Sequence, residues 1–319
     1  MSLWLDFMGA EIRYVKTVSY GKTRIAEAGR GNKETLIFFH GVGGHCEAYA
    51  KNVVALSDEF HVVAYDYVGQ GMSDKPALEY TPMVLVEHLR ELMDALGIEK
   101  AHLSGESMGG WVSGLFTVVY PDRVLKLNFN TAAGLPIITE KGREELNELV
   151  ELTSKATTIS PPTFESVKNR MKWLFHPNNH DSMITDELVN TRLTCYRQAG
   201  SKDVAPRILG MIGMHDDYLI PMEKIKKETL FLWTENNPCH DVACAENSAA
   251  KIPGSLVYVM KNDAAHWPQY EAPEEFRLPE HKRTKFSAQW VQLVDFLAIS
   301  PATFKRSEFA SFSPIYVVL

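Results

Sequence analysis

Short, solid apolar runs recur along the first 130 residues of the chain. Residues 11–28 alternate between polar and apolar positions, as the two strands of a hairpin do, and apolar runs follow at 35–40 and 60–66. Two further runs, at 101–104 and 124–129, have the same character. Runs of this length that lack alternation are typical of strands buried on both faces of a sheet.

Stretches with helical periodicity lie between these runs, at 46–57, 81–96 and 108–120. Strands that alternate with amphipathic helices predict an α/β fold with a mainly parallel sheet and helices on both of its faces.

The strand pattern disappears over residues 134–222. Three helical stretches fill this region, at 141–154, 163–175 and 185–198. Strand-like runs return at 229–233 and 255–260, and a closing helix is predicted near 285–298. The sequence therefore predicts a sheet core made of residues 1–133 and 223–319, with residues 134–222 inserted as a helical lid.

The overall composition narrows the class of protein. The chain has 319 residues, of which 45% are hydrophobic and 23% charged, values that suit a globular protein with a large core. Its net charge of −7 disfavours nucleic acid or an anionic membrane as the main partner. No secretory pattern and no apolar run of about 18 residues is visible. We expect a cytoplasmic enzyme with a small-molecule substrate, and a homo-oligomer is compatible with these data.

The four cysteines, at 46, 195, 239 and 244, are scattered and form no CxxC pair. Neither a disulfide framework nor a zinc site is indicated. We therefore expect reduced thiols, no metal and no cofactor.

The sharpest chemical signal is the sequence Gly105-Glu-Ser-Met-Gly109, which lies between a predicted strand and a predicted helix. A G-x-S-x-G sequence in that context is a nucleophile elbow, a strained turn that exposes a serine hydroxyl. Ser107 is the candidate nucleophile. Because a serine hydroxyl needs a base, a histidine after the last strands is expected. His266 has that place, whereas His40, His45 and His240 also lie at predicted strand ends.

The oxyanion that forms during acyl transfer needs two backbone N–H donors. The residue after the nucleophile, Met108, supplies one candidate. The second candidate is the N–H of Val42, in the glycine-rich sequence His40-Gly-Val-Gly-Gly44 that follows an early strand.

Several motifs now stand in a fixed order: HGVGG at 40–44, DYVGQGMS at 66–73, GESMGG at 105–110 and AHW at 265–267. With this series the chain resembles the α/β-hydrolase fold family over nearly its whole length, with residues 134–222 in the place of the lid. Within the family it most resembles the meta-cleavage product hydrolases, which cleave a carbon–carbon bond in 2-hydroxy-6-oxo-dienoates that arise from aromatic ring fission.

Two features carry the resemblance to this subgroup. The pair His266-Trp267 is similar to the subgroup's His-Trp pair, and the segment 185–192 is similar to a lid segment whose arginine binds the substrate carboxylate. The resemblance implies substrate-binding roles for Arg192 and Trp267. A solvent-facing helix arginine is the alternative for Arg192.

The chain departs from the family at the third member of the triad. Spacing puts Asn237 in the acid's place, and an asparagine can accept the ring N–H of a histidine but carries no charge. Glu235, Asp241 and Glu106 are the nearby replacements. The loop after the strand at 124–129 offers only amides. A neutral Ser-His-Asn arrangement is the favoured interpretation.

Glu106 is the second departure, because the subgroup usually has there an asparagine that helps to bind the substrate carboxylate. A glutamate would repel that group unless it pairs with Arg192 or is protonated by burial. In either case a substrate without an anionic group becomes plausible.

The favoured function is therefore serine-dependent hydrolysis of a small, largely apolar carbonyl compound, with carbon–carbon cleavage of a ring-fission product as the preferred reaction. The alternatives are a carboxylesterase acting on a small apolar ester and, because of Asn237, a catalytically impaired member that binds a ligand. Met171, Trp173 and Phe175 either line an apolar pocket or belong to the core.

Overall fold

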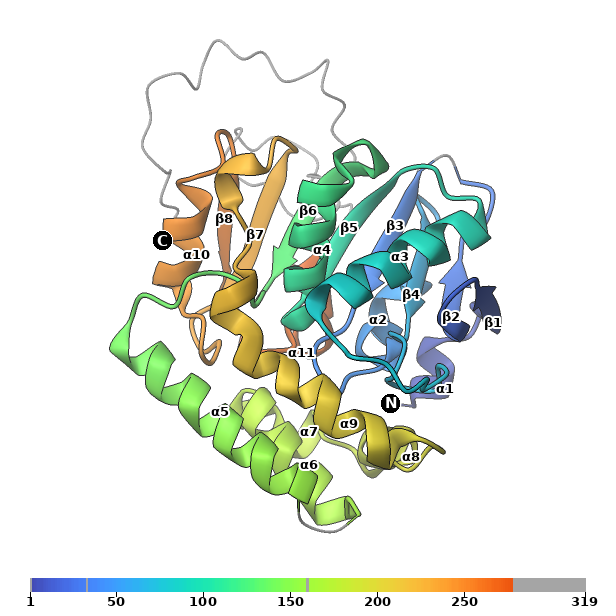
Figure 1. Ribbon diagram of the computed structural model, residues 1–319, viewed down its shortest axis with the longest axis vertical. Helices are drawn as coiled ribbons and strands as arrows, with labels where there is room; N and C mark the ends of the chain where they lie inside the picture. The colour runs from blue at the N-terminus through green and yellow to red at the C-terminus, as the bar shows by residue number, and fades with distance from the viewer. Residues whose placement is uncertain (1, 33, 159–160, 278–319) are drawn as a thin grey trace.

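The chain folds around one eight-stranded sheet (Figure 1). The computed structural model describes residues 2–32, 34–158 and 161–277, so the predicted helix near 285–298 lies outside the described residues. The strand order is β1-β2-β4-β3-β5-β6-β7-β8. The first two strands form the predicted hairpin, β2 pairs antiparallel with β4, and all later pairs are parallel.

The predicted strands are confirmed, with ends that differ by at most two residues. Their bounds are β1 Glu11–Thr17, β2 Gly21–Ala28, β3 Thr35–Phe39, β4 His61–Tyr65, β5 Ala101–Glu106, β6 Val124–Asn130, β7 Thr229–Thr234 and β8 Leu256–Met260.

Both faces of the sheet are covered, which is why the strands lack alternation. In β3, Ile37 and Phe39 belong to one buried cluster with residues of helices α3 (Pro82–Leu96) and α4 (Met108–Val119), and Leu36 and Phe38 belong to a second cluster on the opposite face. All four side chains are inaccessible to solvent. Alternate residues of a strand point to opposite faces, so a doubly covered strand is apolar throughout.

The helices outside residues 134–222 are α1 Leu3–Asp6, α2 Ala50–Val53, α3 Pro82–Leu96, α4 Met108–Val119, α10 Val242–Ala249, α11 Pro268–Glu271 and α12 Pro273–Arg277. The local sequence bounds α3 clearly: Thr81 accepts a hydrogen bond from the Val84 N–H at its start, and Gly97 ends it with φ +68°. These are ordinary helix stop and start signals.

The single helix predicted at 46–57 is wrong. The chain forms a 3₁₀ turn at Cys46–Tyr49 and then the short α2. Tertiary contacts set this path, because the Cys46 N–H donates to Asp66 and the Asn52 side chain donates to the Gln269 carbonyl.

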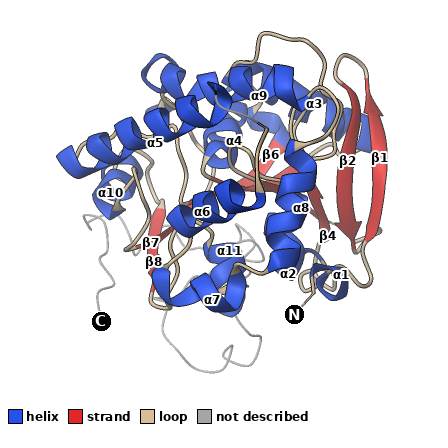
Figure 2. Ribbon diagram, turned by 90° about the horizontal axis from the view of Figure 1, so that it is seen from below, coloured by secondary structure: helices blue, strands red, loops and turns tan. Residues whose placement is uncertain are grey.

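A second group of helices lies at one end of the sheet, at the bottom of Figure 1, and Figure 2 shows it spread across that end. These are α5 Glu140–Thr158, α6 Phe164–Leu174, α7 His180–Met183, α8 Asp186–Tyr196 and α9 Ser201–Gly210. All five fall within residues 134–222, and the division of the chain at those boundaries stays a prediction. Neither α9, which contains Pro206, nor α10 is predicted by the periodicity.

The cysteines and the helix lengths can be compared with what the composition predicts. All four cysteines are buried free thiols. No helix in the described ranges combines the length and the apolar character needed to cross a membrane.

Candidate active site

Ser107 lies at the turn between β5 and α4, in a backbone conformation that L-residues rarely adopt, with φ 53° and ψ −123°. The neighbouring glycines permit the turn. A Cβ on Gly105 would lie 2.2 Å from the Gly109 carbonyl oxygen, and one on Gly109 would lie 2.3 Å from the Phe39 carbonyl oxygen. Such strain costs about 1–3 kcal/mol and is found where function needs it. The turn places Ser107 in the wall of a pocket.

The two candidate oxyanion donors flank this serine. Val42 and Met108 both line the pocket, and within the described part of the chain neither N–H donates a hydrogen bond. The loop that carries Val42 is held by the next residue: the Gly43 N–H donates to Gln70 Oε1 at 2.7 Å, and the Gly43 carbonyl accepts from Tyr196 Oη at 3.0 Å. The two N–H groups are therefore available to a substrate oxygen.

The His266 ring is held in one tautomer by Asn237. His266 Nδ1 lies 2.6 Å from Asn237 Oδ1. The Asn237 amide cannot be reversed without loss, because its Nδ2 donates to the His240 carbonyl oxygen at 2.5 Å. Nδ1 therefore carries the proton, and Nε2 keeps the lone pair that a base needs.

The other candidates for the acid position lie elsewhere. Glu235 is exposed, and Asp241 accepts hydrogen bonds from the Thr139 hydroxyl and the Cys244 N–H. Of the residues considered, only Asn237 meets His266 Nδ1, as the spacing suggested.

Glu106 is buried beside both groups. Its side chain is 1% exposed, Oε2 accepts the Gly41 N–H at 2.6 Å, and Oε1 lies 3.2 Å from His266 Nε2. Burial raises the pKa of Glu106 to about 8, although the Gly41 hydrogen bond and the nearby Arg192 charge oppose this. Burial, with the charges of Arg170 and Arg192, lowers the pKa of His266 to about 3. At pH 7 the Glu106 carboxyl thus keeps its proton, and its Oε1 lies beside His266 Nε2.

This arrangement decides between the two sequence hypotheses for Glu106. An ion pair with Arg192 is wrong, since no oxygen of Glu106 lies within 4.0 Å of a guanidinium nitrogen in the described chain. Protonation by burial accounts for the buried carboxyl instead. Glu106 Oε1 thus lies beside Nε2, the nitrogen that Ser107 would use, and the Ser107 hydroxyl makes no hydrogen bond to any described residue. Catalytic hydrogen bonds often form only when substrate is bound.

The pocket lies between the carboxyl ends of the strands and helices of the segment that the sequence predicts to be a lid. The core contributes Gly41, Val42, Gly44, Glu106, Ser107, Met108, Trp111, Ala133, Pro238, Cys239, His240, His266 and Trp267. The lid contributes Leu146, Leu149, Arg170, Trp173, Leu174, Arg192, Ile208, Met211, Ile212 and His215. The lining is thus mostly apolar, with a few polar groups near Ser107, as in many small-molecule sites.

Arg192 is not the solvent-facing residue that was the alternative interpretation. It is 1% exposed, its Nε donates to Tyr196 Oη at 2.8 Å, and its guanidinium lies 5.2 Å from the Trp267 ring centre. Its Nη1 is buried without a hydrogen-bond partner among the described residues.

Of the three candidates Met171, Trp173 and Phe175, one lines the pocket and two belong to the core. Trp173 lines the pocket. Met171 and Phe175 are core residues, and the Phe175 ring packs at 5.4 Å from that of Trp267.

Sequence reasoning missed three residues that shape the site. Arg170 lines the pocket, and Tyr196 joins Arg192 to the Gly43 carbonyl. Glu271 fastens the histidine loop to the lid, because Oε1 accepts the Ala265 and Trp267 N–H groups and Oε2 accepts the His176 N–H. No local motif signals these roles, since each depends on contacts between distant parts of the chain.

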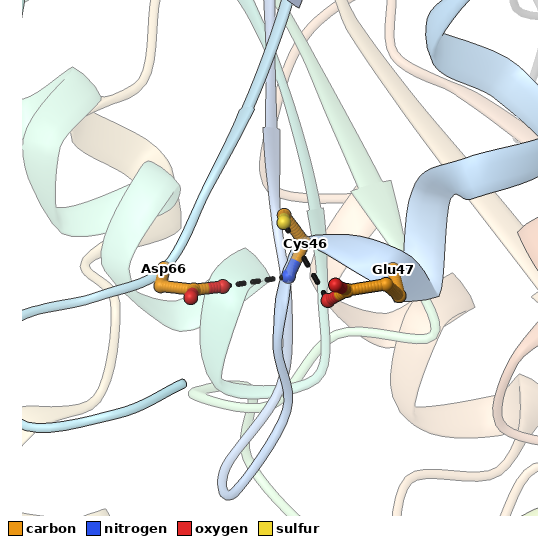
Figure 3. A group of neighbouring side chains, drawn as sticks. All are labelled: Cys46, Glu47 and Asp66. Carbon is orange, nitrogen blue, oxygen red and sulfur yellow. Dashed lines mark hydrogen bonds between the residues drawn. The ribbon is translucent and has the colours of Figure 1, made fainter. Parts of the chain in front are cut away.

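One cluster has the composition of a metal site, namely Cys46, Glu47 and Asp66 (Figure 3). Arg24 already supplies a cation there: it donates to both Glu47 oxygens at 2.8 Å and to Asp66 Oδ2 at 2.7 Å. Burial also raises the pKa of the Cys46 thiol, which opposes the thiolate that a metal requires. We assign the cluster to the support of the loop that follows HGVGG.

Comparisons with known proteins place this chain among hydrolases of the same fold. The family model described as the alpha/beta hydrolase fold matches residues 34–273. A 2-hydroxy-6-oxononadienedioate/2-hydroxy-6-oxononatrienedioate hydrolase of Escherichia coli K12 is 27% identical over 279 residues, which are 84% of this chain and 93% of that protein. A monoacylglycerol lipase of Rattus norvegicus is 26% identical over 270 residues, which are 81% of this chain and 78% of that protein.

Among solved structures, a meta-cleavage product hydrolase of Pseudomonas fluorescens IP01 superposes with a TM-score of 0.70 at 23% identity, over 84% of this chain and 95% of that one. At 23% identity, this similarity shows only that the two proteins share a fold. The match of the family model establishes that the chain belongs to the α/β-hydrolase fold family, and this match together with relatives that are named hydrolases and lipases shows that it is a hydrolase.

Proposed function

We propose that this hydrolase uses Ser107 and His266 to cleave a carbon–carbon bond in a small carbonyl compound that carries a carboxylate, as the products of aromatic ring fission do. The observation that carries the proposal is the position of Arg192. A buried guanidinium with a nitrogen that lacks a partner, in the same pocket as Ser107, fits a substrate carboxylate. The relative from Escherichia coli, whose name is that of a dienedioate hydrolase, supports the same reaction class.

The proposed reaction begins with proton transfer. The 2-hydroxy enol of the substrate becomes a 2-ketone, with His266 Nε2 moving the proton from that oxygen to C5. Ser107 Oγ then adds to the carbon of the separate 6-oxo group while its proton passes to Nε2, and the Val42 and Met108 N–H groups stabilise the oxyanion. The C5–C6 bond breaks and its electron pair passes to C5, where conjugation with the 2-ketone stabilises it, and the departing fragment takes the proton from His266.

A second half-reaction regenerates the enzyme. The acyl group left on Ser107 is attacked by water, whose proton passes to His266 Nε2, and the carboxylic acid departs as the proton returns to Ser107. Asn237 keeps the ring in the required tautomer throughout. It supplies no negative charge to the imidazolium, so the proposed enzyme works with a weaker base partner than a Ser-His-Asp triad has.

A carboxylesterase is the second candidate. The apolar lining by the lid, and a glutamate where the subgroup has a carboxylate-binding asparagine, favour a small apolar ester. The relative named monoacylglycerol lipase supports ester chemistry.

A fluorophosphonate probe tests the nucleophile. We expect the purified full chain to be labelled and Ser107→Ala not to be labelled. Ser113→Ala is the matched control, since Ser113 is buried in the same helix and lies outside the pocket. Equal labelling of all three proteins, or of none, would contradict the proposal. Turnover of a 2-hydroxy-6-oxo-dienoate without turnover of p-nitrophenyl esters then selects carbon–carbon cleavage, and the reverse selects the esterase.

A further inference from the structure

Arg170 reaches the pocket from a different helix than Arg192 does. It belongs to α6, and its guanidinium lies 5.6 Å from the Trp173 ring centre. Its Nη1 is buried and has no hydrogen-bond partner in the described part of the chain, and no carboxylate described there lies within ion-pair distance of it. Arg170 and Arg192 thus share one feature: each has a buried guanidinium nitrogen that nothing in the described protein satisfies.

The two arginines act on one another and on the catalytic histidine. The charge of Arg192 adds to burial in lowering the pKa of Arg170, and both charges lower the pKa of His266. An arginine nevertheless stays protonated in proteins. The pocket therefore holds two positive charges close to each other.

No other group in the pocket offsets these charges at pH 7. Glu106 is the only carboxyl that lines it among the described residues, and with a pKa of about 8 it is uncharged. His240 and His266 are also uncharged, because burial lowers the pKa of each to about 3. His215 contacts His240 and Asp216 and carries no negative charge.

A buried arginine, Arg192, and a partly buried one, Arg170, each with a buried nitrogen that lacks a partner, are costly side by side, and an anion bound between them offsets that cost. We propose that Arg170 is a second anion-binding residue beside Arg192, and that the substrate is a dicarboxylate with an apolar carbon skeleton. The apolar part fits the side chains that lie in the same pocket, which are Leu146, Leu149, Ile208, Met211 and Ile212. This inference rests on the proposed function in one respect, that the Ser107 pocket is the substrate site.

Binding of compounds that the proposed hydrolase cannot cleave, measured on the full chain by calorimetry at pH 7, tests the inference. The probes are adipate, with two carboxylates, hexanoate, with one, and 1-hexanol, with none. We expect adipate to bind at least about tenfold more tightly than hexanoate, and 1-hexanol to bind most weakly. Arg170→Gln and Arg192→Gln should each weaken adipate binding at least about tenfold. Arg143→Gln, a change at an exposed arginine of α5, should not.

Thermal stability gives a second readout that does not depend on activity. Removal of a buried charge without a partner should leave Arg170→Gln at least as stable as the wild type when no ligand is present. At one adipate concentration, the Tm of the wild type and of Arg143→Gln should rise clearly more than that of Arg170→Gln.

Three results would overturn the inference: no adipate binding, equal binding of adipate and hexanoate, or wild-type adipate binding by Arg170→Gln. Equal binding that both arginine variants weaken would show that one carboxylate is shared by the two residues. Fluorophosphonate labelling reports on Ser107 separately, so retained labelling without adipate binding would contradict this inference and leave the proposed function standing.

Discussion

The Nε2 atom of His266 lies 3.2 Å from Oε1 of Glu106, the residue directly before the candidate nucleophile. The other ring nitrogen lies 2.6 Å from Asn237 Oδ1. Both ring nitrogens thus lie beside side chains that are uncharged at pH 7. Because Nε2 must accept the Ser107 proton, we expect the protonation state of Glu106 to govern the base.

Glu106→Gln should change how activity depends on pH. Above about pH 8 the wild-type carboxyl ionises, and the carboxylate holds a proton on Nε2 and repels the developing oxyanion. We expect kcat/KM to fall by up to about tenfold per pH unit above that value in the wild type, and to stay level in Glu106→Gln. Glu144→Gln, at an exposed glutamate of α5, is the control. A fall near pH 8 that persists in Glu106→Gln would assign it to another group.

Glu106→Gln should also remove a loss of stability that the wild type shows as the pH rises. Because the folded-state pKa of Glu106 lies above its ordinary value, the folded state binds more protons than the unfolded state between about pH 4.5 and pH 8. Stability is thus lost as pH rises through this window, by an amount on the order of a few kcal/mol. Glu106→Gln should lack this loss, and urea unfolding at pH 5 and pH 8 checks it.

The acid limb of the activity profile should lie well below pH 6.5. Burial and the two arginine charges lower the pKa of His266 to about 3, so the base stays unprotonated at pH 5. Arg170→Gln removes one of these charges and should move the limb to higher pH. The pH dependence of fluorophosphonate labelling measures both effects, and a wild-type midpoint near pH 6.5 would contradict this account.

Asn237→Asp should reduce activity, although it restores the residue type of the family's triad. The new carboxylate oxygen would face the His240 carbonyl oxygen, which now accepts from Asn237 Nδ2 at 2.5 Å. We expect the free energy of unfolding to fall by about 1–3 kcal/mol and kcat/KM at pH 7 to fall with it. Asn236→Asp, one residue earlier, is the control. A rise in kcat/KM would instead identify Asn237 as a weakened triad member.

Tyr196→Phe should loosen both the oxyanion loop and the anion site. The variant loses the hydrogen bond to the Gly43 carbonyl and leaves Arg192 Nε without its partner. Each loss costs about 1 kcal/mol, so we expect kcat/KM to fall about tenfold, with KM rising for carboxylate substrates. Tyr14→Phe, at an exposed tyrosine of β1, should behave as the wild type. An unchanged KM would show that Tyr196 does not position Arg192.

Arg24→Met should destabilise the fold far more than a surface change does. It leaves Glu47 and Asp66 buried without their cation, for an expected loss of about 3–5 kcal/mol. Arg30→Met, which breaks ion pairs at an arginine that is 57% exposed, should cost less than about 1 kcal/mol. Urea unfolding compares the two variants. Similar losses would show that the Arg24 cluster adds nothing to loop support.

Local signals determined the sheet and the nucleophile turn. An apolar run such as 35–40 defines a doubly buried strand because successive side chains point to opposite faces. Glycines at 105 and 109 allow the strained turn at Ser107 because a Cβ at either position would meet backbone atoms. The strand pattern is a simple repeat and the nucleophile motif spans only five residues, so both can be recognised in the sequence, although the contact that requires Gly109 comes from Phe39 of β3.

The tertiary structure decided which groups meet and what charge they carry. Asn237 and His266 are 29 residues apart, and only the fold brings their side chains together and orients the amide. Protonation of Glu106 and the unsatisfied charge of Arg170 depend on burial and on the absence of nearby counter-charges among the described residues. Solvation and electrostatics act through space rather than along the chain. The sequence could therefore name Ser107 and its base, but the electrostatic character of the pocket emerges only when the lid helices pack over them.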